Sequence, residues 1–134
     1  MKEPRWVDAA DCLAFQAEML AQFGGLSGVR DEGLLDSALN RPRQLAAYGQ
    51  PDLFELAAAY AAGIVKNHPF LDGNKRAGFM AAALFLEYNG ESFQAPEEEV
   101  VLQTLGLAAG AISEKAYAAW LRASCPKRRR PRRA

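Results

Sequence analysis

The chain has 134 residues, half of them apolar, which is enough for one domain with a single core and too few for two domains of ordinary size. Ala, Leu and Phe outnumber Val and Ile, a balance that favours helix over sheet. The formal net charge is zero, no apolar run is long enough to cross a bilayer and the N-terminus does not resemble a signal peptide, so we expect a cytoplasmic protein that does not bind membranes.

Residues 8 to 23 are predicted to form the first helix. Asp8 is suited to cap its start and Gly24 lies just beyond its end. The apolar spacing of this helix comes from Leu13, Ala17, Leu20 and Phe23.

A second, short helix is predicted over residues 32 to 41, with Asp31 as its cap. We expect it to end before Pro42, because the residue ahead of a proline disfavours helical geometry. Residues 42 to 51 are then expected to form an exposed loop.

Asp52 is suited to cap a third helix over residues 53 to 67. Small residues cover most of this helix, so its neighbours can approach closely. Its apolar residues at a spacing of four are Leu56, Tyr60 and Ile64. After a short polar stretch, residues 74 to 89 resume as a helix that is apolar on nearly every side, and such a helix belongs at the centre of a fold.

Two further helices follow. Pro96 suits the first turn of a fifth helix that runs to about Ala108, and Ser113 can cap a sixth over residues 114 to 124. The sixth is expected to face the core with Tyr117, Trp120 and Leu121. The sequence thus predicts an all-α fold, a compact single-domain bundle of about six helices with a central apolar helix after the polar stretch.

The end of the chain differs in composition from the rest. Six of the 16 basic residues lie in the last ten positions, so the preceding residues are acidic overall. A segment of arginine and proline cannot offset its ordering entropy by burial. We therefore predict one domain over residues 1 to 124 and a basic, disordered tail over residues 125 to 134. A solvated tail is preferred over a nucleic-acid contact or an expression-tag remnant.

The polar stretch "NHPFLDGNKR", residues 67 to 76, enters the fourth helix, whose first backbone amides lack carbonyl partners and can bind an anion. Gly73 leaves room for a phosphate, and the side-chain amide of Asn74 can donate to it. Lys75 and Arg76 add two positive charges. Cations at a helix N-terminus are unfavourable by a few tenths to about 1 kcal/mol each, so their presence indicates a bound anion.

The same stretch contains the residues for a metal and for proton transfer. Asp72 offers oxygens to a hard cation such as Mg²⁺, which commonly accompanies phosphate. Neutral His68, the only histidine, can accept a proton from an attacking hydroxyl. Phe70 is expected to enter the core and fix the loop. Each residue also has an ordinary explanation, such as an N-cap for Asp72, but the complete string favours a nucleotide site.

The string "HPFLDGNKR" matches every position of H-x-F-x-[DE]-[AG]-N-[KG]-R, the motif of the Fic fold, and the chain resembles the death-on-curing (Doc) toxins of that group. Residues 23 to 42, 52 to 67 and 84 to 90 share in the resemblance, which spans most of residues 5 to 124. It implies a compact helical domain whose motif loop binds ATP with Mg²⁺ and modifies a hydroxyl side chain of another protein.

The resemblance assigns roles to the motif residues. His68 would be the general base and Asp72 the Mg²⁺ ligand. Gly73 with Asn74 would form the anion nest, and Phe70 would be structural. Lys75 and Arg76 would hold the phosphates.

Lys75 bears on the reaction that the resemblance implies. Fic enzymes proper usually have glycine at this position and transfer AMP, whereas Doc toxins have lysine and move the γ-phosphate of ATP to a threonine of elongation factor Tu, which halts translation. The chain is therefore expected to be an ATP-dependent protein Ser/Thr kinase and the toxin of a toxin-antitoxin system. A protein adenylyltransferase and a non-catalytic antitoxin-binding module remain as alternatives.

Other features of the resemblance concern partners. Toxins of this group usually pair with a small antitoxin whose flexible tail folds into a groove, and the acidic body suits a basic partner. Arg41 and Arg43 are weaker candidates for contact with the target or the nucleotide. One departure is Gln16, where Doc-like chains often have a histidine.

Overall fold

The computed structural model describes residues 3 to 126 and shows only α-helices as regular elements over that range, which confirms the all-α prediction. The helices are α1 (Ala9–Phe23), α2 (Glu32–Tyr48), α3 (Leu53–Asn67), α4 (Asn74–Tyr88), α5 (Glu97–Ala109) and α6 (Glu114–Ala123). Residues 127 to 134, most of the predicted tail, lie outside the described range. Cys125 is buried and its amide donates to the carbonyl oxygen of Arg122 at 3.3 Å, so the folded domain extends past the boundary predicted at residue 124.

Four helices begin at the caps that the sequence predicts. In each, the side-chain oxygen of the cap accepts a hydrogen bond from the amide three residues further on, and such a cap contributes about 1 kcal/mol. These caps are Asp8, Asp31, Asp52 and Ser113.

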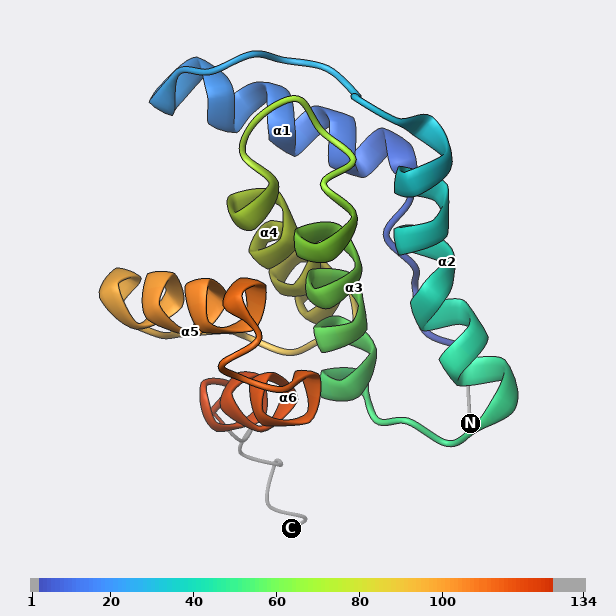
Figure 1. The fold of residues 1–134 in the computed structure, drawn as a ribbon. Coiled ribbons are helices and arrows are strands. Elements are labelled where there is room, and N and C mark those ends of the chain that lie inside the picture. The colour runs from blue at the N-terminus through green and yellow to red at the C-terminus, as the bar shows by residue number, and fades with distance from the viewer. Residues whose placement is uncertain (1–2, 127–134) are drawn as a thin grey trace, which may run out of the picture.

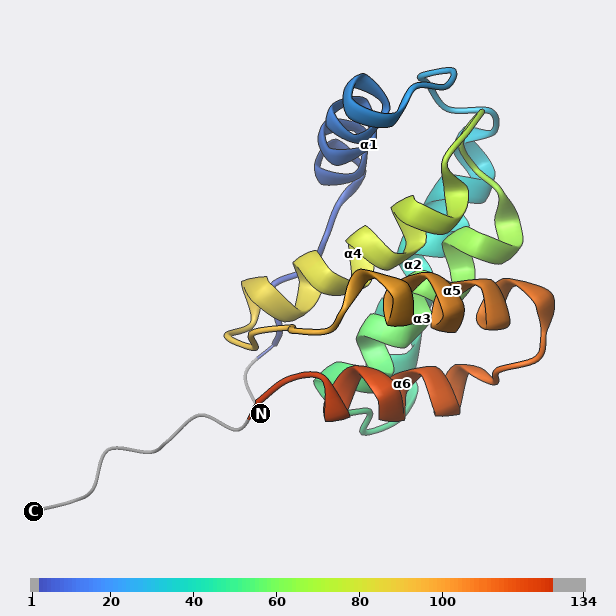
Figure 2. The same ribbon diagram turned by 90° about the vertical axis from the view of Figure 1, so that its left-hand side faces the viewer.

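The most enclosed helix is α3, in which every residue from Leu56 to Val65 is buried. Helices α2, α4, α5 and α6 all contact it, and its contact with α4 is the most extensive in the fold (Figures 1 and 2). Small residues make this possible: a Cβ added to Gly63 would lie 3.1 Å from Cα of Ala38 in α2, and one added to Gly78 of α4 would lie 3.1 Å from the carbonyl oxygen of Ala61. Since α4 buries one face, the central position is occupied mainly by the helix ahead of the motif.

The helix predicted to end before Pro42 instead continues through it, so most of the loop predicted over residues 42 to 51 is helical. Proline removes one hydrogen bond of a helix and usually bends or ends it. Here Pro42 is buried, Ala46 packs against the core, and Nη1 of Arg41 donates to the carbonyl oxygen of Ala59 at 3.4 Å. Contacts with distant parts of the chain therefore hold the second half of α2.

Helix α1 buries a different stripe from the one that its apolar spacing suggests. Of the four residues that define the spacing, only Leu20 is buried, while Leu13 and Phe23 are 43% and 53% exposed. The buried stripe consists of Cys12, Phe15, Gln16, Met19 and Leu20. The buried stripe therefore contains one polar side chain, Gln16, which lies next to the motif loop.

Helix α6 faces the core with the three residues that the sequence predicts, Tyr117, Trp120 and Leu121. The hydroxyl of Tyr117 shares a hydrogen bond of 2.9 Å with that of Thr104, which ties α6 to α5. None of the helices between residues 3 and 126 has both the length and the hydrophobicity of a membrane span.

Candidate active site

The motif loop connects α3 to α4 and lies at one end of this helix pair, near α1 (Figure 1). It begins at His68, which ends α3 in the left-handed conformation with φ 49° and ψ 54°. His68 is the single non-glycine residue with a positive φ in the described part of the chain, and it is exposed. Its imidazole has no hydrogen-bond partner among residues 3 to 126, so its nitrogens are available to a substrate.

The interior of the loop is fixed by Asn74 and Phe70. Oδ1 of Asn74 accepts from the amide of Phe70 at 2.9 Å, and Nδ2 donates to the carbonyl oxygen of the same residue at 3.0 Å. The Phe70 side chain is fully buried. The Asn74 side chain, which the sequence assigned to an anion, is therefore used mainly to close the loop, and its backbone N–H is what the residue presents at the start of α4.

The segment between α1 and α2 pairs with the motif loop. The carbonyl oxygen of Pro69 accepts from the amides of Arg30 at 2.7 Å and Asp31 at 3.1 Å, and the amide of Leu71 donates to Gly28 at 3.1 Å. Val29 and Phe70 form an antiparallel bridge between the two segments. The loop is thus held from outside along its length.

The start of α4 is a candidate anion-binding mouth. Gly73 precedes the helix in the left-handed region, φ 73° and ψ 24°, and supplies no side-chain cap. The first helical hydrogen bond runs from Ala77 to Gly73 at 2.8 Å, so the amides of residues 74 to 76 have no partner within the helix. A Cβ on Gly73 would lie 2.6 Å from Cε of Met19. The left-handed conformation favours glycine here, and any side chain would also have to displace the end of Met19.

A small pocket of about 370 Å³ opens in front of this mouth. Asp72 and Arg76 line it together with Gly73, so both signs of charge face one cavity. Oδ2 of Asp72 accepts from the amide of Leu26 at 2.8 Å, which fixes the carboxylate and leaves its second oxygen for a ligand. No cluster of three or more potential metal ligands occurs in the described residues. One carboxylate is nevertheless what Mg²⁺ uses when phosphate oxygens and water complete its coordination.

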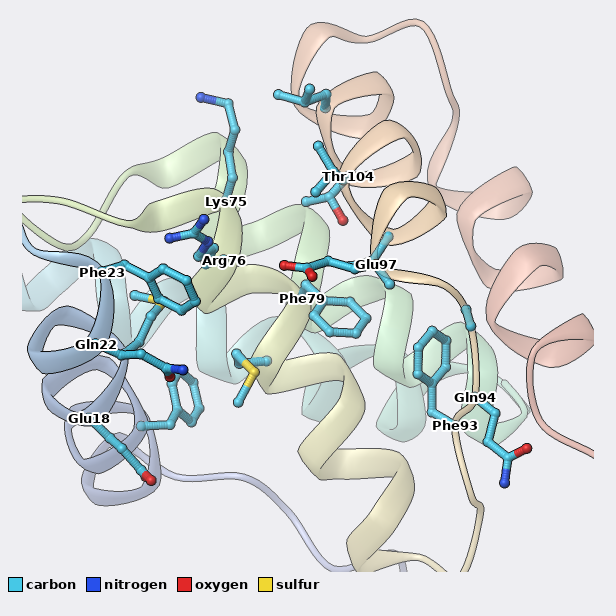
Figure 3. Close-up of a pocket in the computed structure, with 17 residues that line it drawn as sticks. Glu18, Gln22, Phe23, Lys75, Arg76, Phe79, Phe93, Gln94, Glu97 and Thr104 are labelled. Carbon is cyan, nitrogen blue, oxygen red and sulfur yellow. The ribbon is translucent and has the colours of Figure 1, made fainter.

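A larger groove of about 690 Å³ adjoins the pocket and lies between α1, α4 and α5 (Figure 3). The guanidinium of Arg76 stacks on the ring of Phe23 at 3.9 Å, and both residues line the groove and the pocket. Lys75 is at the same end of the groove, while Phe79 and Phe93 form its floor further along. The Glu97 side chain extends into the groove from α5. A cationic end therefore continues into a channel that has aromatic side chains along its floor and two carboxylates in its lining, Glu18 and Glu97.

Comparison with known proteins agrees with this geometry. Residues 6–86 match the Fic/DOC family. The chain belongs to this family. The family match runs from the segment before α1 into α4, so it contains the motif loop and the segment that pairs with it.

Two Fic/DOC relatives have names that describe an activity. The chain is 34% identical over 120 residues to the protein kinase doc of Escherichia phage P1, an alignment that covers 88% of this chain and 94% of the relative. It is 48% identical over 71 residues to the toxin Doc of Mycolicibacterium smegmatis, covering 51% of this chain and 54% of that protein.

The structure adds two residues to this Fic/DOC site that the motif does not contain. Gln16 is 1% exposed, and its Nε2 donates to the carbonyl oxygens of Asp72 at 3.3 Å and Gly28 at 3.5 Å, while its Oε1 accepts from the Gly28 amide at 3.3 Å. Arg30 donates through its guanidinium to the end of α3. The sign of Gln16 in the sequence was its departure from the histidine that Doc-like chains often have there, whereas the sequence has no comparable sign of Arg30.

Arg41 and Arg43 are not brought to the site. Arg41 forms an ion pair of 2.5 Å with Glu114, and Arg43 stacks on Trp6 at 5.2 Å. Both are in the second half of α2, and neither lines the pocket or the groove. The structure therefore gives no support to their predicted contact with target or nucleotide.

Proposed function

We propose that this chain is a toxin that acts as an ATP-dependent protein kinase and transfers the γ-phosphate to a threonine hydroxyl of a translation factor like elongation factor Tu. The observation that carries the proposal is Lys75 at the anion-binding mouth, in a chain similar over most of its length to a protein named a protein kinase. Phosphorylation of such a factor would arrest translation, which is consistent with the toxin named among the relatives.

The helix mouth supports the binding of a triphosphate. Three partnerless amides and the positive end of the helix dipole favour an anion, and Lys75 and Arg76 add full charges beside them. Because Arg76 already rests on Phe23, its guanidinium needs little rearrangement when the anion arrives. Charge neutralisation and positioning supply most of the catalysis of phosphoryl transfer.

Asp72 is the residue that would hold Mg²⁺. When bound there, the ion would offset the negative charge that develops on the phosphate during transfer. Both the side chain and the backbone of Asp72 are held, since the Leu26 amide donates to its carboxylate and the Gln16 side chain donates to its carbonyl oxygen. The carboxylate is therefore oriented before any ligand is present.

His68 would act as the general base. In the proposed step, the threonine oxygen forms a bond to the γ-phosphorus, the bond from that phosphorus to the bridging oxygen breaks, and ADP leaves. The hydroxyl proton passes to the neutral imidazole. General-base catalysis of this kind contributes about 10²- to 10⁴-fold to the rate.

The main alternative is transfer of AMP from the same site with the nucleotide reversed. A lysine in place of glycine fills space and adds a point charge, which favours presentation of the γ rather than the α phosphorus. Incubation with Mg²⁺, elongation factor Tu and ATP labelled at either the γ or the α phosphate separates the two. Label from γ on the target supports the kinase, and label from α would overturn it.

The antitoxin is a second part of the proposal. The groove between α1, α4 and α5 is apolar along its floor and cationic at the end next to the mouth, so it suits an amphipathic helix or tail of a partner. Such a segment would cover the mouth and restrain the toxin.

Growth separates the toxin from a non-catalytic module. Producing the wild-type protein in bacteria that lack an antitoxin is expected to stop growth, and His68→Ala is expected to restore it. Equal growth with both proteins would exclude a catalytic toxin.

A further inference from the structure

His68 occupies a backbone conformation that needs support. Left-handed geometry is unfavourable for a non-glycine residue and persists where the surroundings hold it. At the same point α3 ends, and the last carbonyl groups of a helix lack partners within it. The turn that carries the proposed base is therefore strained and also exposes unpaired acceptors.

One side chain serves these acceptors. Nε of Arg30 donates to the carbonyl oxygen of His68 at 2.7 Å, and Nη2 donates to that of Asn67 at 3.0 Å. Within residues 3 to 126, no other side chain donates to either oxygen. The positive guanidinium also complements the negative end of the α3 dipole.

Arg30 is itself held in register with the loop. Its amide donates to the carbonyl oxygen of Pro69 at 2.7 Å, and Val29 beside it bridges to the fully buried Phe70. The guanidinium thus reaches the end of α3 from a backbone that is fixed to the same loop. Arg30 lines neither the pocket nor the groove, so its contacts are with the protein rather than with a ligand.

We propose that Arg30 is a positioning residue for His68: its guanidinium holds the left-handed turn at the end of α3 and so places the imidazole relative to the anion-binding mouth. This inference rests on the proposed role of His68 as the base. Without Arg30, the turn relaxes toward ordinary backbone geometry and the imidazole moves from its place. Loss of Arg30 would then affect the chemical step more than nucleotide binding, because the anion-binding mouth is formed by the start of α4 and not by the turn at His68.

The kinetic test compares Arg30→Met, which removes charge and donors, with Arg30→Lys, which keeps the charge and one donor. Since a displacement of about 1 Å can reduce a rate by about 100-fold, we expect Arg30→Met to lower kcat for phosphorylation of elongation factor Tu by about 10- to 100-fold. The KM for Mg·ATP is expected to stay within about twofold, and Arg30→Lys to recover part of kcat. Arg5→Met is the matched control, because Arg5 is also exposed but stacks on Tyr88 at 3.9 Å, away from the loop.

A second measurement does not depend on activity. Because His68 is the only histidine, its Cε1 proton gives a single imidazole signal in the NMR spectrum of the full chain. Arg30→Met is expected to shift and broaden this signal, Arg30→Lys to do so less, and Arg5→Met to leave it unchanged. Thermal unfolding of each variant identifies any that fails to fold, in which case Arg30→Lys carries both measurements.

The outcomes separate this inference from the proposed function. Unchanged kcat in Arg30→Met, or an imidazole signal identical to that of the wild type, overturns the role of Arg30. If the wild type transfers no phosphate, the proposed kinase fails, and the NMR comparison alone then decides whether Arg30 holds the turn. A fall in kcat and a rise in KM of equal size in Arg30→Met would show a general loss of the site and would also overturn it.

Discussion

Replacing Gly73 by alanine tests whether the mouth of α4 is built around that glycine. The substitution introduces a Cβ at φ 73°, where left-handed geometry costs roughly 1 to 2 kcal/mol. The new atom would lie 2.6 Å from Cε of Met19, so the end of that side chain must leave its rotamer, at about 0.5 to 1.5 kcal/mol. We expect Gly73→Ala to lower the free energy of unfolding by about 2 to 3 kcal/mol.

Gly110 provides a matched control. It ends α5 with φ 79° and ψ 5°, close to the conformation of Gly73, and a Cβ there would meet nothing within 4 Å. Gly110→Ala should therefore show the backbone strain alone, about 1 to 2 kcal/mol. The effect of alanine on the unfolded chain is the same in both variants and cancels in the comparison.

Urea denaturation of both variants, alone and combined with Met19→Leu, measures how much of the lost free energy of unfolding comes from the contact with Met19. Leucine removes the Cε atom at nearly constant volume, so Gly73→Ala should cost about 1 kcal/mol less in that background, while Gly110→Ala is unchanged. The added methyl also narrows the pocket, and the KM for Mg·ATP should rise in Gly73→Ala alone. Equal losses at Gly73 and Gly110, or no relief from Met19→Leu, would refute this account of the mouth.

Three other predictions concern the loop, the core and the reaction. Gln16→Leu leaves partly buried backbone groups of Gly28 and Asp72 without their side-chain partner, so we expect a loss of about 1 kcal/mol in urea denaturation. We also expect a higher Mg²⁺ concentration for half-maximal activity, and an unchanged Mg²⁺ dependence would contradict this prediction. Burial raises the pKa of Tyr60 and of Tyr117 from 10.0 to about 12. The free energy of unfolding that these two neutral hydroxyls contribute is complete below pH 10. It is lost as the pH rises toward 12, by about 1.4 kcal/mol per pH unit for each tyrosine. Tyr60→Phe should therefore reduce the slope of the free energy of unfolding against pH, measured by urea titration. Lys75→Gly should lower transfer of γ label to the target and permit transfer of α label, and retention of γ transfer alone would count against a role for the lysine in nucleotide orientation.

Most of the fold could be predicted because its signals are local. The caps Asp8, Asp31, Asp52 and Ser113 mark helix starts by a hydrogen bond that spans three residues, and that pattern is visible in the sequence. The continuation of α2 through Pro42 was not visible, because it depends on packing against segments far away in the chain. The packing of α2 against distant segments therefore outweighs the local tendency of proline to end a helix.

The site was predictable to a similar extent. Motif spacing identified the loop and the mouth of α4, since the loop and the helix start are continuous in sequence. It did not show that the Asn74 side chain would clasp Phe70, nor that Arg30 would reach the end of α3. The family resemblance also suggested Arg41 and Arg43 as weaker candidates, whose partners in the structure are Glu114 and Trp6. Side chains that act across the fold have no fixed spacing from the groups they serve.

The connection of α3 to α4 through the motif has a consequence for control of the protein. These two helices have the largest shared interface of the fold, and small residues such as Gly78 keep them in close contact. The turn at His68 therefore cannot open widely without disturbing the centre of the molecule, and its hydrogen-bonded amides, those of His68, Phe70 and Leu71, should exchange with solvent more slowly than the partnerless amides at the start of α4. Under the proposed function, an inhibitor would switch activity off by blocking access to the loop from outside, and the protein freed of that inhibitor would be competent at once.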